Sequence, residues 1–295
     1  EIFAYITKLR AVTDALKVKR LKVGYDFRSN ELEMTIDENS NLISTAYAEE
    51  TPSHALIEDC MLLANKEAAR QFERGIFRIH EPPSQNKLQI LYQELAGIGM
   101  FIDIKNSIKE TITEIQKQAQ DMGLASEVDT LIIQSQMQAR YAPLNSGHFG
   151  LGFEEYTHFT SPIRRYSDLI VHRLLKAISN NDTTEGSYVL RNIEALSMTI
   201  SEKEREASRI EVEFQQRKFA RWAASNLNRE FKARITATDP DIKAEVHDEI
   251  QGARLNITSV GNIFLFEDVL VRIDKVDIPK AKIFASVVSK LDKDV

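Results

Sequence analysis

Cysteine is almost absent from this sequence, because Cys60 is the only one in the chain. It cannot form an internal disulfide, and no Cys or His lies at metal-ligand spacing from it. No apolar run is long enough to span a membrane, and the amino terminus lacks a charged and then apolar leader. These absences exclude a disulfide-stabilised or membrane-anchored protein, and we expect a soluble protein of the reducing cytoplasm.

Positive charge is scarce relative to negative charge. The 38 Lys and Arg residues against 44 Asp and Glu residues give a net charge of -6. Any affinity for phosphate groups must therefore come from a local basic patch, so the net charge neither proves nor excludes a nucleic-acid partner. Hydrophobic residues make up 43% of the sequence, which suffices for the core of one large domain and one small domain.

The first part of the chain is mostly helical in pattern, with one hairpin predicted at 31–36 and 42–47. Ser53 is expected to cap the second helix, and the polar run NNDTTEGS reads as a linker. The helices expected from apolar spacing are 1–19, 54–72, one that stops at 97–99, 106–121, 126–139, one that ends near 179, and a long charged helix that reaches about 222–227.

The pattern changes to short strands after the long helix. Five β-rich segments between 231 and the end are separated by Asp, Pro and Gly residues, which predicts a small five-stranded barrel of the OB type. Phe264 and Phe266 are expected on one strand face of its core, and Trp222 at its junction with the helix. The predicted fold class is α+β, with a helix-rich domain at 1–227 and the barrel at 228–295.

The stretch from Gly147 to Leu175 concentrates polar, charged and planar side chains at the start of a helix. Thr160 or Ser161 can cap that helix, and Pro162 suits its first position. Arg164 and Arg165 would then lie beside the positive end of the helix dipole, where cations are unfavourable unless an anion neutralises them. Because guanidinium groups match phosphate oxygens in pairs of hydrogen bonds, we expect a phosphodiester backbone there.

Spacing assigns different roles within this stretch. Arg164, Asp168 and His172 follow one another at four-residue steps, so Asp168 is expected to orient Arg164 and His172 to extend the hydrogen-bond chain. Nearby planar side chains offer faces on which bases could stack; they are His148, Phe149, Tyr156, His158 and Phe159. The alternative interpretation is a surface salt bridge with Phe149, Phe159 and Tyr166 in the core.

Four motifs occur in a fixed order before the long helix and the barrel: IEDCMLLANKEAARQF, FRIHEPPS, GHFGL and YTHFTSPIRRYSDLIVHRLL. In this order they resemble the ribonuclease II / ribonuclease R family, from about Ile2 to the carboxy end. The resemblance implies processive 3′-5′ hydrolysis of single-stranded RNA to nucleoside 5′-monophosphates, with Mg²⁺ as cofactor. His80 in the second motif resembles a family position, but a His before two prolines is usually a loop anchor, and we expect that role here.

The resemblance also implies roles for individual residues. Arg164 would contact the scissile or adjacent phosphate and stabilise the charge that develops there, while Ser161 and Arg165 steady the backbone. Glu211 of the long helix would touch the terminal ribose, with Glu213 as the rival. The catalytic candidates are thus Arg164 and Glu211, and the RNA-binding candidates are Ser161, Arg165, Tyr166, His148, Phe149, Tyr156 and His158.

A cluster of carboxylates that could hold Mg²⁺ is missing from the sequence. In the family that cluster is four aspartates upstream of the region matched here, so we expect a carboxy-terminal part that is inactive alone and holds no metal itself. The expected partners are the missing amino-terminal portion, RNA, and a helicase or other RNA-decay protein. The alternatives are a non-catalytic RNA-binding or protein-docking module and a purely structural domain.

Overall fold

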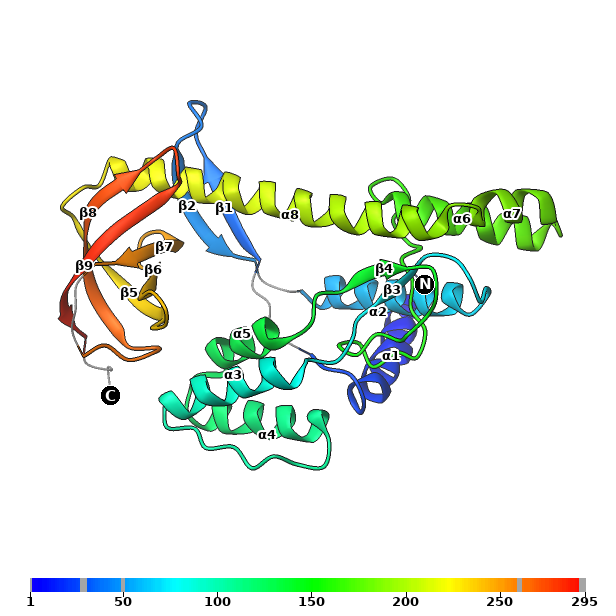
Figure 1. Cartoon of the computed structure of the whole chain (residues 1–295), viewed down its shortest axis with the longest axis horizontal. Coiled ribbons are helices and arrows are strands. Elements are labelled where there is room, and N and C mark those ends of the chain that lie inside the picture. The colour runs from blue at the N-terminus through cyan, green and yellow to red at the C-terminus, as the bar shows by residue number, and fades with distance from the viewer. Residues whose placement is uncertain (1, 27–30, 49–50, 259–261, 292–295) are drawn as a thin grey trace.

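A long helix, α8, joins a β-barrel to a mainly helical portion in the computed structural model of the chain (Figure 1). The structure describes residues 2–26, 31–48, 51–258 and 262–291. The helices are α1 (Ile2–Leu21), α2 (Pro52–Ala69), α3 (Gln85–Gly97), α4 (Ile108–Asp121), α5 (Ala125–Ser135), α6 (Tyr166–Ser179), α7 (Thr183–Leu190) and α8 (Ile193–Ala224). None of the described helices is long and apolar enough to cross a membrane.

The strands form two separate two-stranded sheets and a closed barrel. The strands are β1 (Leu32–Ile36), β2 (Leu42–Tyr47), β3 (Phe77–Ile79), β4 (Arg140–Ala142), β5 (Glu230–Ala237), β6 (Lys243–His247), β7 (Gln251–Ile257), β8 (Asp268–Asp277) and β9 (Lys282–Lys290). The antiparallel pair β1–β2 is the predicted hairpin, and β3 pairs with β4 across the middle of the helical portion.

Polar side chains cap the starts of α2 and α7 by accepting hydrogen bonds from backbone N–H groups. Thr51, rather than the predicted Ser53, caps α2 by accepting from the His54 N–H, and Pro52 occupies the first helical position. The predicted linker after α6 instead contains α7, because the Asp182 side chain accepts from the Thr184 and Glu185 N–H groups. The polar composition of that segment therefore reflected a helix cap.

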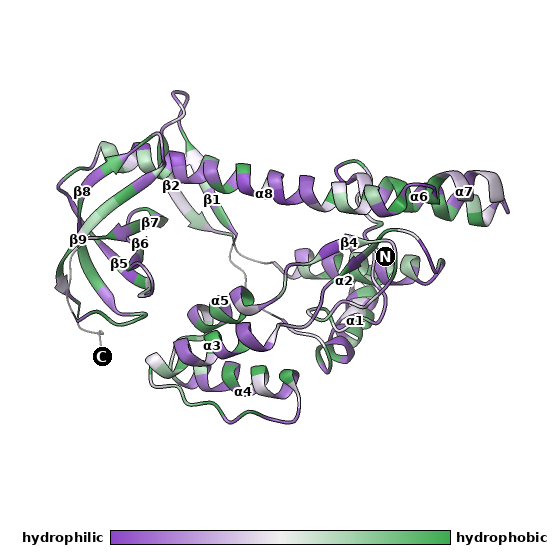
Figure 2. Ribbon diagram, viewed as in Figure 1, coloured by the Kyte–Doolittle hydropathy of each residue, from purple (hydrophilic) through white to green (hydrophobic). Residues whose placement is uncertain are grey.

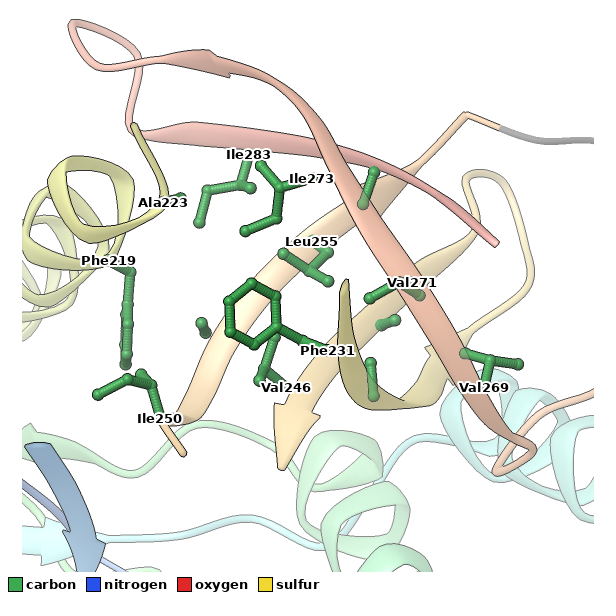
Figure 3. Close-up of a cluster of buried hydrophobic side chains, with 14 of the residues drawn as sticks. Phe219, Ala223, Phe231, Val246, Ile250, Leu255, Val269, Val271, Ile273 and Ile283 are labelled. Atoms are coloured by element: carbon green, nitrogen blue, oxygen red, sulfur yellow. The ribbon is translucent and has the colours of Figure 1, made fainter. Parts of the chain in front are cut away.

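The barrel closes in the order β5-β6-β7-β9-β8, with β7 and β9 parallel and the other neighbours antiparallel. Alternate residues of each strand point inward, as Phe231, Leu255 and Ile273 do in Figure 3. The ring of Trp222 lies 5.0 Å from that of Phe231, which confirms its place at the junction of α8 and the barrel. The predicted α+β class with a five-stranded OB-like barrel is confirmed.

The β1–β2 hairpin packs on the barrel although it precedes the barrel by almost 200 residues in the chain. Leu32, Met34 and Leu42 lie against the barrel core, and the Thr45 hydroxyl bonds both backbone groups of Gln251. The domain boundary at 227/228 stays a prediction. In the structure the hairpin packs against the barrel core, although its residues fall within the predicted helix-rich domain.

Two larger cores and one smaller cluster stabilise the helical portion. The first core lies among α3, α4 and α5, which we call the helical lobe, and the second joins β4, α6, α7 and the start of α8. The smaller cluster joins the end of α2 to β3 and β4. Between that second core and the barrel, the central part of α8 is largely hydrophilic (Figure 2), and its side chains from 205 to 214 are exposed. The middle of α8 therefore spans the two parts without packing against either.

Candidate functional site

Asn65 of α2 holds the segment that leads to the arginines. Its side chain is 2% exposed. The amide oxygen accepts from the Phe159 and Thr160 N–H groups at 2.9 and 3.1 Å, and the amide nitrogen donates to the Tyr156 hydroxyl at 3.0 Å. A buried amide with three such bonds fixes the backbone it contacts. Asn65 is not among the site residues predicted from the sequence, although its position on the apolar face of MLLANKEAA marks it as a buried polar group.

Asp168 organises the turn before α6. It is fully buried and accepts from the Ser161 N–H at 2.8 Å, from Arg165 Nη2 at 2.9 Å and from the Ser167 hydroxyl at 2.9 Å. The predicted pairing of Asp168 with Arg164 is therefore wrong. Because residues 162–164 form a turn bonded to Ser161, α6 begins at Tyr166, four residues after the predicted start at Pro162.

The two arginines of this turn differ in their surroundings. The Arg165 guanidinium is held by Asp168 and its side chain is 19% exposed. Arg164 is exposed, and within the described parts of the chain its side chain makes no hydrogen bond or ion pair. A guanidinium that is free and projects from a fixed turn is available to an incoming anion. The Arg164 guanidinium is thus accessible to a phosphate group, as the phosphate-binding prediction requires.

His172 lies against Phe159 instead of extending a chain from Asp168. Their rings stack at 4.3 Å with an interplanar angle of 13°, and His172 Nε2 lies 2.9 Å from the Phe159 carbonyl oxygen. The prediction that His172 continues the hydrogen bonds of Asp168 is wrong, because the Phe159 carbonyl captures the imidazole. Phe159 itself is a packed residue next to the second core of the helical portion.

The planar side chains before the turn pack on one another. Tyr156 is 4% exposed and contacts the rings of both His148 and His158 edge-on. Phe149 lies 5.1 Å from the ring of Tyr25 and packs against the core of the helical lobe. Tyr156 is buried and His148, Phe149 and His158 are half-buried, so the stacking of bases on these rings stays a prediction.

Burial keeps the two histidines of this cluster neutral at neutral pH. Desolvation, followed by the positive charge of Arg165, lowers the pKa of His158 to about 2. Desolvation, followed by the neighbouring His80, lowers the pKa of His148 to about 3. A neutral His158 can share a hydrogen bond with the Tyr141 hydroxyl, whose oxygen lies 2.8 Å from Nδ1. The cluster therefore offers polar, uncharged groups beside Arg165.

Ser161 and Tyr166 lie at opposite ends of the arginine turn. Ser161 is half-buried, and its backbone N–H is engaged by Asp168 while its carbonyl accepts from Arg165 N–H. Tyr166 is 54% exposed. The structure thus places Ser161, Arg164, Arg165 and Tyr166 together in one turn, with Tyr166 presenting an open ring. Their contacts with RNA stay predictions.

The glutamates predicted to contact ribose lie on the exposed part of α8. Glu211 is exposed, and Glu213 lies 3.8 Å from Arg209 one turn earlier on the same helix. The acidic residue of α8 that contacts the site region is Glu204, which accepts from Arg78 of β3 at 2.5 Å. The sequence pattern did not single out Glu204, since its partner Arg78 is 126 residues away in the chain.

The prediction that His80 anchors a loop is confirmed. His80 is 8% exposed, its Nε2 lies 2.7 Å from the Met137 carbonyl oxygen, and its Nδ1 accepts from the Gly150 N–H at 2.9 Å. Burial lowers its pKa, which favours the neutral form that these contacts need. His80 therefore ties the end of β3 to the loop that carries His148.

Metal ligands do not gather anywhere in the described residues. No group of three or more His, Cys, Asp or Glu side chains among residues 2–26, 31–48, 51–258 and 262–291 could hold a metal ion. The described residues therefore do not by themselves fit a magnesium site. The arrangement can bind and orient an anion at Arg164.

These features define a class of protein: a portion of an α+β catalytic domain that presents an exposed arginine in the turn before a helix and carries an OB-like barrel. The RNB domain family matches residues 2–181. The chain belongs to the ribonuclease II / ribonuclease R family.

Relatives and solved structures agree with this placement. Ribonuclease R of Helicobacter pylori strain 26695 is 38% identical over 221 residues, covering 73% of this chain and 34% of that protein. Ribonuclease R of Aquifex aeolicus is 35% identical over 229 residues, covering 75% and 32%. The chain thus spans about a third of the length of the curated relatives it matches.

The fold is shared with proteins that are more distant in sequence. The apo form of Mycoplasma genitalium RNase R matches with a TM-score of 0.88 at 20% identity, over 97% of this chain and 50% of that chain. Yeast Ssd1, described as a pseudonuclease, matches with a TM-score of 0.57 at 17% identity, over 77% of this chain and 30% of that chain. Both likenesses concern the fold.

Proposed function

We propose that this chain is the phosphate-orienting and RNA-gripping portion of a magnesium-dependent 3′-5′ exoribonuclease. The complete enzyme would hydrolyse single-stranded RNA processively to nucleoside 5′-monophosphates. The observation that carries the proposal is Arg164, whose exposed guanidinium has no hydrogen-bond or ion-pair partner among the described residues and projects from a turn fixed by Asp168. Solved structures of Mycoplasma genitalium RNase R with single-stranded and with double-stranded RNA support RNA as the ligand class.

Arg164 would act on the phosphate and Arg165 on the turn. The free guanidinium can neutralise negative charge that develops on phosphate oxygens during hydrolysis. Arg165 is already committed to Asp168, so it positions the turn and adds a fixed positive charge beside it. Magnesium would supply an activated water and neutralise the leaving oxygen in the complete enzyme. Its ligands would come from carboxylates outside the described residues.

The experiment replaces Arg164 in a chain joined to an upstream aspartate-bearing segment from a relative. Arg164→Ala should lower turnover about 10²- to 10³-fold, because one preorganised charge-stabilising donor is lost. RNA affinity should change far less, since other contacts to the strand remain. Arg191→Ala is the matched control: Arg191 is also exposed but lies after α7, where it packs over Tyr188. Equal turnover for wild type and Arg164→Ala would contradict the proposal.

A second candidate is a non-catalytic RNA-binding module. The observation that favours it is the lack of a metal-ligand group in the described parts of the chain, together with the shared fold of a pseudonuclease. The chain alone, given labelled single-stranded RNA and Mg²⁺, should bind the RNA in a salt-sensitive way without releasing nucleotides. Release of mononucleotides would rule out this candidate, and no binding at low salt would favour a purely structural domain.

The proposal extends to location and partners. A reducing cytoplasm suits a chain with one cysteine. A helicase or another RNA-decay protein is the proposed partner for structured RNA, and the barrel is proposed to guide the strand. Co-purification of the complete protein from its native cells, with and without ribonuclease treatment, would separate protein partners from RNA-bridged ones.

A further inference from the structure

A loop of the barrel inserts into the core of the helical lobe. Phe266, in the segment just before β8, is 7% exposed and belongs to the hydrophobic core formed by α3, α4 and α5, while Leu265 is partly buried against the same core. Phe264, two residues earlier, is 53% exposed. The sequence-based expectation that Phe264 and Phe266 share a face of the barrel core is therefore wrong.

The backbone at Phe266 adopts a conformation that needs support. Its φ is 63°, in the left-handed region that residues other than glycine rarely occupy. Two backbone hydrogen bonds to β5 hold the loop: Phe266 N–H donates to the Ile235 carbonyl at 2.9 Å, and Ile235 N–H donates to the Glu267 carbonyl at 3.0 Å. A bulky residue kept in this conformation indicates that the position of its ring is constrained by the fold.

Arg234 of β5 makes a second connection beside the loop. Its Nε and Nη2 donate to the two carboxylate oxygens of Asp268 at 2.7 and 2.8 Å, and its Nη1 donates to Glu127 in the first turn of α5. The side chains of Glu127 and Asp268 are each 19% exposed. The paired hydrogen bonds to Asp268 fix the guanidinium, so the bond to Glu127 has a defined direction across the contact.

We propose that Phe266, Arg234 and Glu127 form a latch that holds the barrel against the helical lobe so that the barrel and the Arg164 turn engage one RNA strand together. This inference rests on the proposed function. Without the latch, the barrel would be joined to the helical portion by the exposed middle of α8 and by the chain around the β1–β2 hairpin. The three residues act on RNA through the placement of the barrel, so they are positioning residues.

A fixed barrel has a measurable consequence for RNA of different lengths. A strand long enough to reach both surfaces binds the second one at a high effective concentration, which depends on how narrowly the barrel is placed. A short strand reaches one surface at a time and gains nothing from that placement. The latch therefore determines the ratio of affinities for long and short RNA, and a role in barrel stability alone would not change this ratio.

The first experiment compares Phe266→Ala with Phe264→Ala by RNA-binding anisotropy. The probes are oligouridines of about 4 and about 20 nucleotides, chosen around the site size of an OB fold. In Phe266→Ala the affinity ratio of long to short RNA should fall about tenfold, which is about 1.4 kcal/mol, with short-RNA affinity unchanged. Phe264→Ala changes an exposed ring of the same loop and should keep the wild-type ratio. An unchanged ratio in Phe266→Ala would overturn the proposal.

The second experiment measures the position of the barrel without RNA. Spin labels at Thr113→Cys on α4 and Ser289→Cys on β9, in a Cys60→Ser background, report the distance between helical lobe and barrel. The wild-type latch should give one narrow distance distribution, and Phe266→Ala a broad one. Glu127→Gln keeps the size of the side chain and removes only the charge that pairs with Arg234. It should broaden the distribution less, which keeps the test valid if Phe266→Ala folds poorly. Arg272→Ala, which breaks a pair within β8, is the control.

The two experiments separate the latch from the proposed function. If neither the wild type nor any variant binds RNA but the distances broaden as expected, the proposed function fails and the mechanical latch stands. If the distances stay narrow in both Phe266→Ala and Glu127→Gln, the latch is overturned whatever the RNA result. If the distances broaden while the affinity ratio holds, the claim that the latch presents one strand to both surfaces is overturned.

Discussion

Asn65 shows how one buried side chain can determine the geometry of a site that it does not enter. Asn65→Ala would leave the Phe159 and Thr160 N–H groups without their acceptor and remove the partner of the Tyr156 hydroxyl. Each buried group left unpaired costs about 1–3 kcal/mol. We therefore expect Asn65→Ala to lower the free energy of unfolding by roughly 3 kcal/mol or more, measured by urea denaturation.

Tyr156→Phe is the matched variant for this prediction. It removes only the hydroxyl, so one hydrogen bond of Asn65 is lost and both bonds to the backbone remain. The expected loss is about 1 kcal/mol. Hydrogen exchange at the Phe159 and Thr160 amides should accelerate in Asn65→Ala and stay slow in Tyr156→Phe. Equal losses of stability and equal exchange would contradict the assignment of the backbone bonds to Asn65.

At the same scale, the sequence was informative about residue types and less so about partners. It singled out Arg164 and Arg165 because cations at a helix start are unusual, and the structure places both in one turn. Helical spacing favoured Asp168 as the partner of Arg164. In the structure Asp168 pairs with Arg165 instead, because α6 starts later than predicted and the turn before it is not helical. Spacing rules apply only inside a helix, and one misplaced start changes every pair that depends on it.

Among the elements, the contact of the hairpin with the barrel depends on a glycine. Gly252 of β7 has φ +85°, and a Cβ added there would lie 2.5 Å from Leu32 Cδ2 of β1. Gly252→Ala should therefore strain the strand and displace Leu32, lowering the free energy of unfolding by about 1–3 kcal/mol. Fluorescence of Trp222, the single tryptophan, reports this unfolding because its ring contacts Phe231 in the barrel.

Gly97→Ala is the control for this substitution. Gly97 ends α3, a Cβ added there would meet no atom within 4 Å, and its φ is not positive. Alanine should be neutral there or stabilise by up to about 1 kcal/mol, because it favours helix more than glycine does. If Gly252→Ala were as stable as Gly97→Ala, the close packing of hairpin on barrel would not hold.

Periodicity predicted most elements, and it failed where a contact between distant segments decides the structure. The barrel strands and the long helix follow from alternation and helical spacing, which are local properties. The insertion of Phe266 into the helical lobe could not be read from the sequence, since an apolar residue near a strand looks the same in either core. The same applies to Asn65, whose partners lie 91 to 95 residues away in the chain.

On the scale of the whole molecule, the barrel is connected to the helical portion at several separate places. α8 enters it directly, the β1–β2 hairpin lies on it, and Phe266 reaches from it into the helical lobe. These contacts set the separation between the barrel and the Arg164 turn. In the proposed function, the two surfaces would therefore meet one RNA strand in a fixed relation.

The overall charge leads to the final prediction, on the salt dependence of RNA binding. A net charge of -6 provides no general attraction for a polyanion, so the salt effect should report local phosphate contacts alone. Each neutralised phosphate of a single strand contributes about -0.7 to the slope of log affinity against log salt. Arg164→Ala should therefore make the slope shallower by about 0.7, since one contact is lost.

The control for the salt series is again Arg191→Ala, which removes the same charge from an exposed position outside the arginine turn. Anisotropy titrations at four or more salt concentrations give the slope for each variant. If both variants changed the slope equally, binding would depend on total charge and Arg164 would have no special contact. A change in Arg164→Ala alone requires a phosphate at its guanidinium, because a screened, distant charge cannot alter the number of counterions released.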